Sequence, residues 1–214
     1  MLLNYFNDPT ILVIASLIMV MALIFHNMFQ TWVAKRLGDP TPTYQGFGQF
    51  DPKTHLEPMG VFFLLLLGFG WARQVPVNGR NYPGRGRKEA LVWYAGPVAF
   101  LIVATISWFF EVLFRVLGAG PSLISAFAVA GLVASLHAVI HLFPVFPLDG
   151  ARAAMAWGGP RVRRFVQQLA QFGVLGFVVI FFLLSFTGIT GAISSLFRIV
   201  IYGGIVAIFR AFGA

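Results

Sequence analysis

The sequence contains no cysteine and very few charged residues. Asp, Glu, Lys and Arg make up 10% of its 214 residues, and only seven residues are acidic. Without cysteine, the chain can form neither a disulfide framework nor a thiolate metal site. The chain is 58% hydrophobic, with a mean hydropathy of +0.83, which excludes a water-soluble domain of this size. We therefore expect an integral membrane protein whose solvent is the lipid bilayer.

The net charge of +8 comes from Lys and Arg residues that lie between apolar runs rather than in one patch. Charges in this arrangement determine membrane topology under the positive-inside rule and do not indicate a nucleic-acid partner. Residues 1–8 lack the basic residues of a signal peptide, and no small-residue cleavage site follows the first apolar run. We therefore expect this run to be retained as a membrane span.

Five apolar runs are long enough to cross a bilayer as helices. The expected spans are Thr10–Leu37, Ala90–Leu117, Ser122–Phe146, Phe165–Phe186 and Ala192–Phe212. A further apolar run, Met59–Trp71, is shorter than the ~17 residues that a span needs, so we expect a re-entrant or interfacial segment. The turn-rich residues 43–58 are expected to contain short extended pieces. The sequence therefore predicts an all-α membrane protein with about five transmembrane helices in a single domain, residues 1–214, whose core is about residues 10–186.

The basic residues predict how these spans are oriented. If Met59–Trp71 does not cross, the basic loops over residues 73–88 and 152–164 lie on the same side of the membrane as Lys35 and Arg36. The positive-inside rule then places the N-terminus outside and the C-terminus in the cytoplasm.

His26 lies about ten residues before Lys35 and Arg36. At ~1.5 Å of rise per residue it lies roughly 15 Å deep, where an ionisable side chain is a functional candidate. A zinc-protease helix has a glutamate directly after such a histidine and a second histidine four residues on. This chain has Asn27 and Gln30 at those positions. The spacing is that of a metalloprotease, whereas two of the chemical groups are missing.

Six short motifs follow one another along the chain. They are His26–Trp32, Gly38-Asp39-Pro40-Thr41 with Gln45-Gly46, Pro52–Gly60, Gly70-Trp71-Ala72 with Val75-Pro76-Val77-Asn78, Ala95-Gly96-Pro97, and Leu142–Gly150. In this order they resemble the motifs of the site-2 protease family of intramembrane zinc metalloproteases. The similarity covers most of the chain and is to the compact bacterial form of the family, which has no inserted PDZ domain. It implies the family's fold and a location in a bacterial inner (plasma) membrane.

In the family, two histidines and an aspartate bind zinc, and a glutamate activates the zinc-bound water. The resemblance implies that His26 matches the first ligand and Asp149 the third, while Gln30 replaces the second ligand and Asn27 the base. A carboxamide is a poor zinc ligand beside an imidazole, and asparagine cannot accept a proton near neutral pH. This degenerate HExxH motif predicts a protein with neither peptidase activity nor a cofactor.

A relocated metal site is the alternative. His137 and His141 are i,i+4 neighbours on the helix that leads to Asp149. With His26 and Asp149 they could supply the imidazole and carboxylate ligands that zinc or iron accepts, in an intramembrane zinc metalloprotease. Otherwise these histidines pack in the core of the bundle and hydrogen-bond to Asn27, Gln30 or a free backbone carbonyl.

The core motifs remain while the base and one ligand are replaced, which favours a catalytically inactive member of this fold. We expect a scaffold or helix-binding subunit of a larger membrane assembly. Its expected partners are the lipid bilayer and either other integral membrane subunits or a transmembrane helix.

Overall fold

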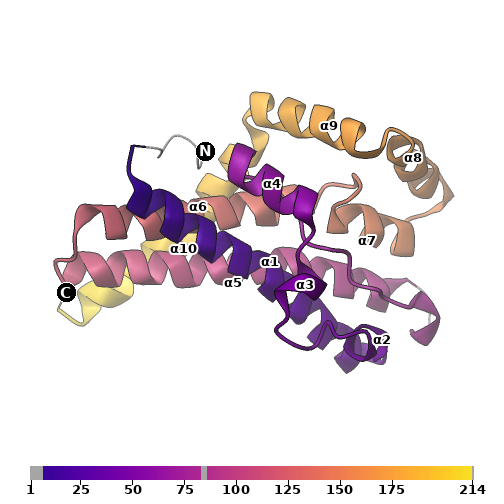
Figure 1. Cartoon of the computed structure of the whole chain (residues 1–214), viewed down its shortest axis with the longest axis horizontal. Helices are drawn as coiled ribbons and strands as arrows, with labels where there is room; N and C mark the ends of the chain where they lie inside the picture. Colours follow the sequence, from indigo (N-terminus) through magenta and orange to yellow (C-terminus); the bar gives the residue numbers. More distant parts are fainter. Residues whose placement is uncertain (1–6, 83–85, 214) are drawn as a thin grey trace.

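The structure is a computed structural model that describes residues 7–82 and 86–213 (Figure 1). Within these residues it consists of helices and one isolated bridge between Leu56 and Ala72. The long helices are α1 (Pro9–Leu37), α5 (Arg87–Val116), α6 (Pro121–His141) and α10 (Ile189–Ala211). The shorter ones are α2 (Thr41–Tyr44), α3 (Pro52–His55), α4 (Pro58–Leu67), the 3-10 turn η2 (Gly79–Asn81), α7 (Asp149–Trp157), α8 (Pro160–Ala170) and α9 (Gly173–Thr187). The all-α membrane class predicted from composition is confirmed.

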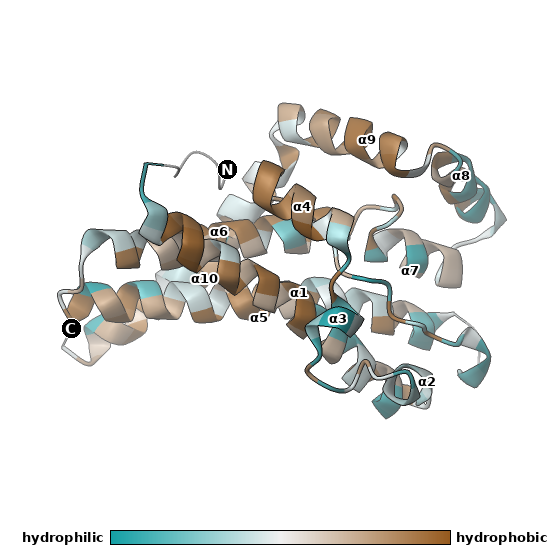
Figure 2. Ribbon diagram, viewed as in Figure 1, coloured by the Kyte–Doolittle hydropathy of each residue, from teal (hydrophilic) through white to brown (hydrophobic). Residues whose placement is uncertain are grey.

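Four helices in the described part of the chain, α1, α5, α6 and α10, are long and apolar enough to cross a bilayer. The pair α8 and α9 adds a fifth crossing if it forms one bent span. The two helices meet at 103°, next to Gly173, whose φ of 54° lies in the left-handed region. The span predicted over Phe165–Phe186 is therefore divided between two helices, α8 and α9. Figure 2 shows the reason, since α8 is largely hydrophilic and α9 is strongly hydrophobic.

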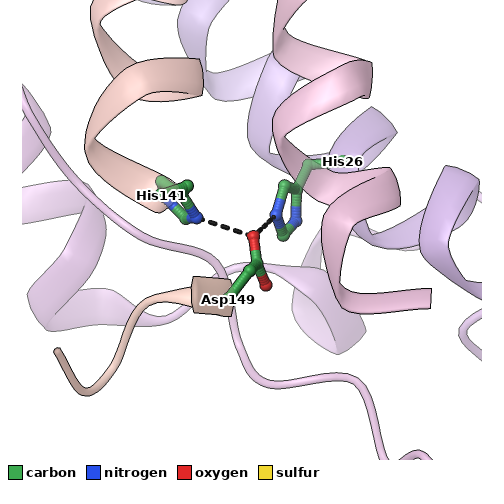
Figure 3. Close-up of side chains that lie close together, drawn as sticks. All are labelled: His26, His141 and Asp149. Carbon is green, nitrogen blue, oxygen red and sulfur yellow. Dashed lines mark hydrogen bonds and ion pairs between the residues drawn. The ribbon is translucent and has the colours of Figure 1, made fainter. Parts of the chain in front are cut away.

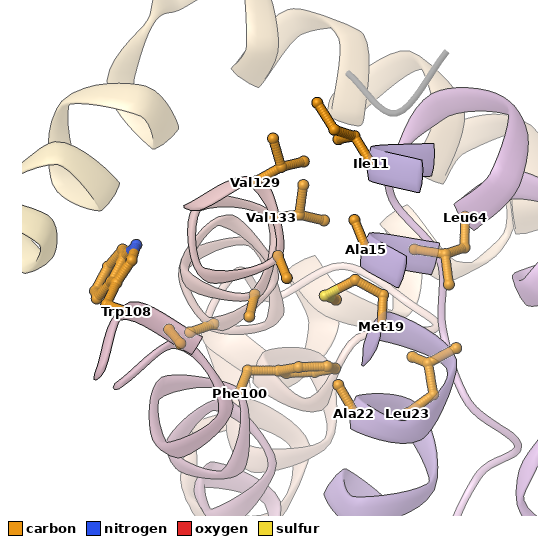
Figure 4. Packing of buried hydrophobic residues seen from close by; sticks show 14 of the residues in the cluster. Ile11, Ala15, Met19, Ala22, Leu23, Leu64, Phe100, Trp108, Val129 and Val133 are labelled. Atoms are coloured by element: carbon orange, nitrogen blue, oxygen red, sulfur yellow. The ribbon is translucent and has the colours of Figure 1, made fainter. Parts of the chain in front are cut away.

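The core of the bundle is the contact between α1, α5 and α6 (Figure 4). Met19 and Leu23 of α1 pack with Phe100 of α5, and Leu64 of α4 and Ile205 of α10 join the same cluster. Lipid tails are as apolar as these side chains, so close packing rather than escape from water holds such helices together. The packing fixes α1 against α5 and α6, and thereby fixes the polar residues further along α1.

The segment around α4 enters the bundle and returns beside its own start. Its ten helical residues rise about 15 Å, which is half of a bilayer core. The chain then turns at Gly68 and comes back, so that Ala72 bridges to Leu56 and the N–H of Arg73 donates to the carbonyl of His55 at 2.7 Å. This geometry agrees with the re-entrant interpretation of Met59–Trp71.

Glycines allow the two arms of this segment to touch through their backbones. A Cβ on Gly60 would collide with the backbone of Trp71, and a Cβ on Gly70 would collide with the carbonyl of Gly60. Of the extended pieces expected over residues 43–58, the structure has one, at Leu56, which bridges to Ala72. The rest of the stretch consists of turns and of the short helices α2 and α3. Pro42 and Pro52 lie in the first turns of these helices, where proline favours a helix start.

The span predicted over Ser122–Phe146 ends earlier, because α6 stops at His141. Pro144 and Pro147 cannot continue a helix, and α7 begins at Asp149.

The last turns of α10 lie beside the C-terminal half of α5, where the rings of Phe109 and Phe209 are 5.4 Å apart. Figure 1 shows the C-terminal end near the turn between α5 and α6 and away from the start of α5. This differs from the expectation that the C-terminus lies with the basic loops. Which side of the membrane each end faces stays a prediction.

Asp39 joins the end of α1 to the loop that precedes α5. The backbone N–H groups of Thr41 and Asn78 donate to its carboxylate at 3.1 and 2.8 Å, and Asn81 Nδ2 and the Tyr82 hydroxyl donate at 2.7 and 3.3 Å. Burial raises the pKa of Asp39, but its hydrogen bonds, led by those to Thr41, outweigh burial and hold the pKa below its ordinary value. Asp39 is therefore an ionised, buried carboxylate that connects the end of α1 to the loop before α5.

We expect Asp39→Ala to lower the free energy of unfolding by about 1–3 kcal/mol, because buried donors lose their acceptor. The loss should exceed that of Asp51→Ala, which removes the half-buried cap of α3 and its hydrogen bond from Thr54. Since the folded-state pKa is lowered, the contribution of Asp39 is complete above the unfolded pKa of about 3.9 and is lost as the pH falls through the folded value. Unfolding in detergent micelles at about pH 7 and about pH 3 tests this. A stability difference between wild type and Asp39→Ala that does not narrow at the lower pH would contradict it.

Candidate metal centre

His26, His141 and Asp149 converge at one point in the interior of the bundle (Figure 3). His26 Nε2 lies 2.7 Å and His141 Nδ1 lies 2.8 Å from the same carboxylate oxygen, Asp149 Oδ2. The three side chains are buried, and one possible ligand atom from each lies within 4.8 Å of the others. They come from α1, α6 and α7, so the site joins three helices.

The proline-rich turn after α6 brings Asp149 back to His141. The chain leaves the helix at His141, passes through Pro144 and Pro147, and begins α7 at Asp149. A Cβ on Gly150 would collide with the backbone carbonyls at the end of α6, so only glycine permits this close return. The turn therefore places a carboxylate next to the last histidine of the preceding helix.

Asn27 fixes the orientation of His26. Its Nδ2 donates to the carbonyls of Arg73 at 2.7 Å and His55 at 3.4 Å, so its Oδ1 is the atom that faces His26 Nδ1 at 3.0 Å. A carbonyl oxygen can only accept, and His26 Nδ1 must therefore be the donor. The residue in the place of a general base thus acts as a hydrogen-bond partner of the first histidine.

Gln30 fixes Asp149 in a similar way. Its Nε2 donates to Asp149 Oδ1 at 2.8 Å and to the carbonyl of Trp93 at 3.1 Å. The Trp93 carbonyl is free because Pro97, four residues further along α5, has no N–H to donate. The sequence analysis missed this contact, and a proline inside an apolar helix was the signal that could have found it.

His137 does not join the other ligand atoms. Its Nδ1 donates to the carbonyl of Val133 at 2.8 Å, and its Nε2 accepts the N–H of Gly70 at 3.1 Å. Both nitrogens therefore have partners outside the cluster, and His137 holds the re-entrant segment against α6. Of the four residues in the relocated site, the structure brings together His26, His141 and Asp149.

A neutral His26 ring has one N–H group, but both of its ring nitrogens face oxygen atoms that accept hydrogen bonds. Its Nδ1 donates to Asn27, so Nε2 of a neutral imidazole carries a lone pair that faces a carboxylate oxygen. At 2.7 Å the two atoms can share a proton on His26. A zinc ion would bind both atoms once they lie about 3.3 Å apart, since Zn–N and Zn–O bonds are ~2.0–2.2 Å long. Two imidazole nitrogens and one carboxylate oxygen are a ligand set that zinc prefers. These residues therefore fit a zinc ion.

Space beside the donor atoms depends on Gly96. A Cβ at this position would collide with His26 Nε2, Asp149 Oδ2 and Gln30 Nε2. The cavity that these side chains line has a volume of about 20 Å³, which admits an ion or one water molecule and no peptide. The glycine of the Ala95-Gly96-Pro97 motif thus keeps α5 clear of the polar cluster.

Asp149 supplies the single carboxylate of this cluster. The chain has seven acidic residues, and the other six have partners elsewhere in the described structure. Asp8, Asp51 and Glu57 cap helices, Asp39 joins two loops, Glu89 accepts from the Trp93 indole, and Glu111 pairs with Arg115. No second carboxylate therefore stands beside the three donors to take a proton from water.

A protein of Bacillus subtilis (strain 168), named "Putative zinc metalloprotease YwhC", is 34% identical over 171 residues, which are 76% of this chain and 77% of the relative. No family model matches the chain, and no solved structure matches it. Identity at this level over about three quarters of both chains shows that the chain belongs to the same zinc-metalloprotease-like family as the Bacillus subtilis protein.

Proposed function

We propose that the chain is a zinc-binding membrane protein that holds the ion on His26, His141 and Asp149 and binds a transmembrane segment without cleaving it. The observation that supports this most is the convergence of three donor atoms at a site that has no second carboxylate. The sequence alone favoured no cofactor. The arrangement of the three side chains favours zinc instead.

Hydrogen bonds around the three ligands support a metal site. Metal-binding histidines usually donate their second ring N–H to an oxygen, as His26 does to Asn27, and ligating carboxylates are themselves hydrogen-bonded, as Asp149 is by Gln30. The amides of Asn27 and Gln30 would thus hold two ligands in place. When bound, zinc acts as a Lewis acid and lowers the pKa of its water.

The absence of cleavage follows from the same two amides. Asn27 cannot take a proton from water near neutral pH, and its Oδ1 already accepts a hydrogen bond from His26. Gln30 occupies the place of a ligand with a side chain that donates to Asp149. A general base contributes about 10²–10⁴-fold to such reactions, so its loss alone would suppress hydrolysis.

A partner helix is the ligand that the remaining fold suits. An apolar cavity of about 230 Å³ lies between α6, the end of α4 and the turn from α9 to α10. Gly68, Gly188 and Gly191 line it, and small residues allow helices to approach closely in a membrane. Binding of a transmembrane segment would need this surface and not the missing base.

The second candidate function is an intramembrane metalloprotease with a relocated site. The position of His141 favours it, because His26, His141 and Asp149 together make a three-ligand set like those of catalytic zinc sites. It differs from the first candidate in requiring cleavage that depends on these ligands.

Metal analysis of the purified protein in detergent tests the zinc site. We expect one zinc ion per chain in the wild type, and loss of zinc in His26→Ala, His141→Ala and Asp149→Ala. His137→Ala, one turn from His141, is the matched control and should retain zinc as long as the helical circular dichroism is unchanged. Asn27→Ala and Gln30→Ala should weaken zinc binding about 10–100-fold. A wild type without zinc, or an Asp149→Ala variant that keeps it, would contradict the proposal.

Restoring the missing groups tests the absence of cleavage. We expect the wild type to leave fluorescent casein and single-span reporter proteins intact, and the double variant Asn27→Glu/Gln30→His to cleave at least one of them about 100-fold faster or more. Asn27→Gln/Gln30→Asn keeps both positions neutral and is the control. Cleavage by the wild type that a zinc chelator and His26→Ala both abolish would replace this proposal by the relocated protease.

A further inference from the structure

A second hollow shares one lining residue, Trp93, with the small cavity at the metal centre. It has a volume of about 670 Å³ and lies between η2, the start of α5, α7 and α8. Ligand sites typically have volumes of about 300–1,000 Å³, so this hollow admits a molecule far larger than water. Neither the zinc site nor the apolar cavity near α9 includes it.

Three arginines and one glutamate give the hollow a positive charge. Arg80, Arg152 and Arg163 line it, and Glu89 is the one acidic residue among its described lining residues. The Glu89 carboxylate accepts a hydrogen bond from the Trp93 indole at 3.5 Å. Three positive charges against one negative charge favour an anion, and a guanidinium presents paired N–H groups that match phosphate oxygens.

Arg152 is the arginine that the fold holds most firmly. Its guanidinium lies 4.8 Å from the ring centre of Phe146 and 5.9 Å from that of Trp93. Its Nε is buried and has no hydrogen-bond partner in the described structure. Its Nη2 donates to Gln74 Oε1, so the two ring contacts and this hydrogen bond hold the guanidinium in the lining of the hollow.

An apolar groove lies on the same two helices as this charged hollow, α5 and α7, and shares no lining residue with it. Its volume is about 300 Å³, and it is lined by Ala90, Leu91 and Tyr94 of α5 and by Trp157 of α7, with Arg87 at its edge. Leu91 and Trp157 are 56% and 59% exposed, which leaves their apolar surfaces open to a ligand. The same two helices thus present a cationic hollow and an apolar groove.

The neighbouring helix indicates that this region lies at the membrane surface. In α8, charged Arg161, Arg163 and Arg164 alternate with apolar Val162 and Phe165, and the chain then bends by 103° into the hydrophobic α9 (Figure 2). Amphipathic helices of this kind lie in the interface plane, where cationic side chains meet lipid phosphates.

We propose that this hollow binds the phosphate group of an anionic phospholipid. Arg80, Arg152 and Arg163 hold the phosphate, and the first part of an acyl chain lies on Leu91, Tyr94 and Trp157. The apolar groove on the same helices favours a lipid over a soluble phosphate compound, which has no chain to place there. The lipid would contact α7, the helix that begins at Asp149.

Native mass spectrometry of the full chain, released from detergent, measures bound lipid directly. Phosphatidylglycerol should bind more tightly than phosphatidylcholine, and binding should weaken as the salt concentration rises. Each lost arginine charge near a lipid phosphate weakens binding by about fivefold, so we expect this effect for Arg80→Ala and Arg163→Ala. Arg164→Ala, on the same helix but outside the lining, is the matched control and should bind as the wild type does.

A further variant tests the apolar groove. Leu91→Asn should weaken binding of phosphatidylglycerol and leave binding of inorganic phosphate unchanged. Three results would each overturn the proposal. The first is equal binding of both lipids, and the second is equal effects of Arg163→Ala and Arg164→Ala. The third is inorganic phosphate or a nucleotide that binds the hollow as tightly as phosphatidylglycerol. The last outcome would assign the hollow to a soluble phosphate compound.

Discussion

One carboxylate oxygen joins the three helices on which the centre of this protein depends. Asp149 Oδ2 faces His26 of α1 and His141 of α6, and Asp149 itself begins α7. The contact with His26 joins residues that are 123 positions apart in the chain, inside a mostly apolar bundle. A buried carboxylate in such a place is costly unless it is fully paired. The rest of the site supplies that pairing, because Gln30 donates to the second oxygen, and a proton or a zinc ion is expected to balance the charge of the first oxygen beside the imidazoles.

The side-chain amides of Asn27 and Gln30 give the helix that contains His26 a different role from that of a zinc-protease helix. In a zinc protease the residues at positions 27 and 30 would be a base and a ligand. Here both side chains are neutral and make hydrogen bonds that orient the residues around the donors, Asn27 through His26 and Gln30 through Asp149. Pro97 and Gly96 contribute from α5, since the first frees a carbonyl for Gln30 and the second leaves room beside the donors. The arrangement favours holding a metal ion over activating a water molecule.

The sequence predicts the class of fold because hydropathy reports directly on the solvent of each segment. It also predicts the return of the segment after α4, from the length of its apolar run and from the side on which the arginines lie. It misses the bend between α8 and α9, since an apolar count over Phe165–Phe186 does not register the left-handed backbone at Gly173. Turns and short proline-led helices likewise take up most of residues 43–58, where the extended backbone is limited to the bridge residue Leu56 and its neighbour.

Residue spacing alone could not choose between the two histidines of α6. His137 and His141 lie on one face of the helix, and the i,i+4 rule treats them alike. Their roles differ in the structure because α6 ends at His141, where the proline turn brings Asp149 within 2.8 Å, whereas His137 receives the Gly70 N–H from the re-entrant segment. Which histidine contacts Asp149 depends on tertiary contacts, and spacing rules applied to a single sequence do not predict such contacts.

X-ray absorption at the zinc edge tests the central claim most directly. The account predicts zinc at about one ion per chain, with nitrogen and oxygen neighbours at ~2.0–2.2 Å and multiple-scattering features of two imidazole rings. His141→Ala should reduce the imidazole signal to one ring. Protein that contains no zinc, or zinc whose nearest shell lacks imidazole and is unchanged in His141→Ala, would contradict the account.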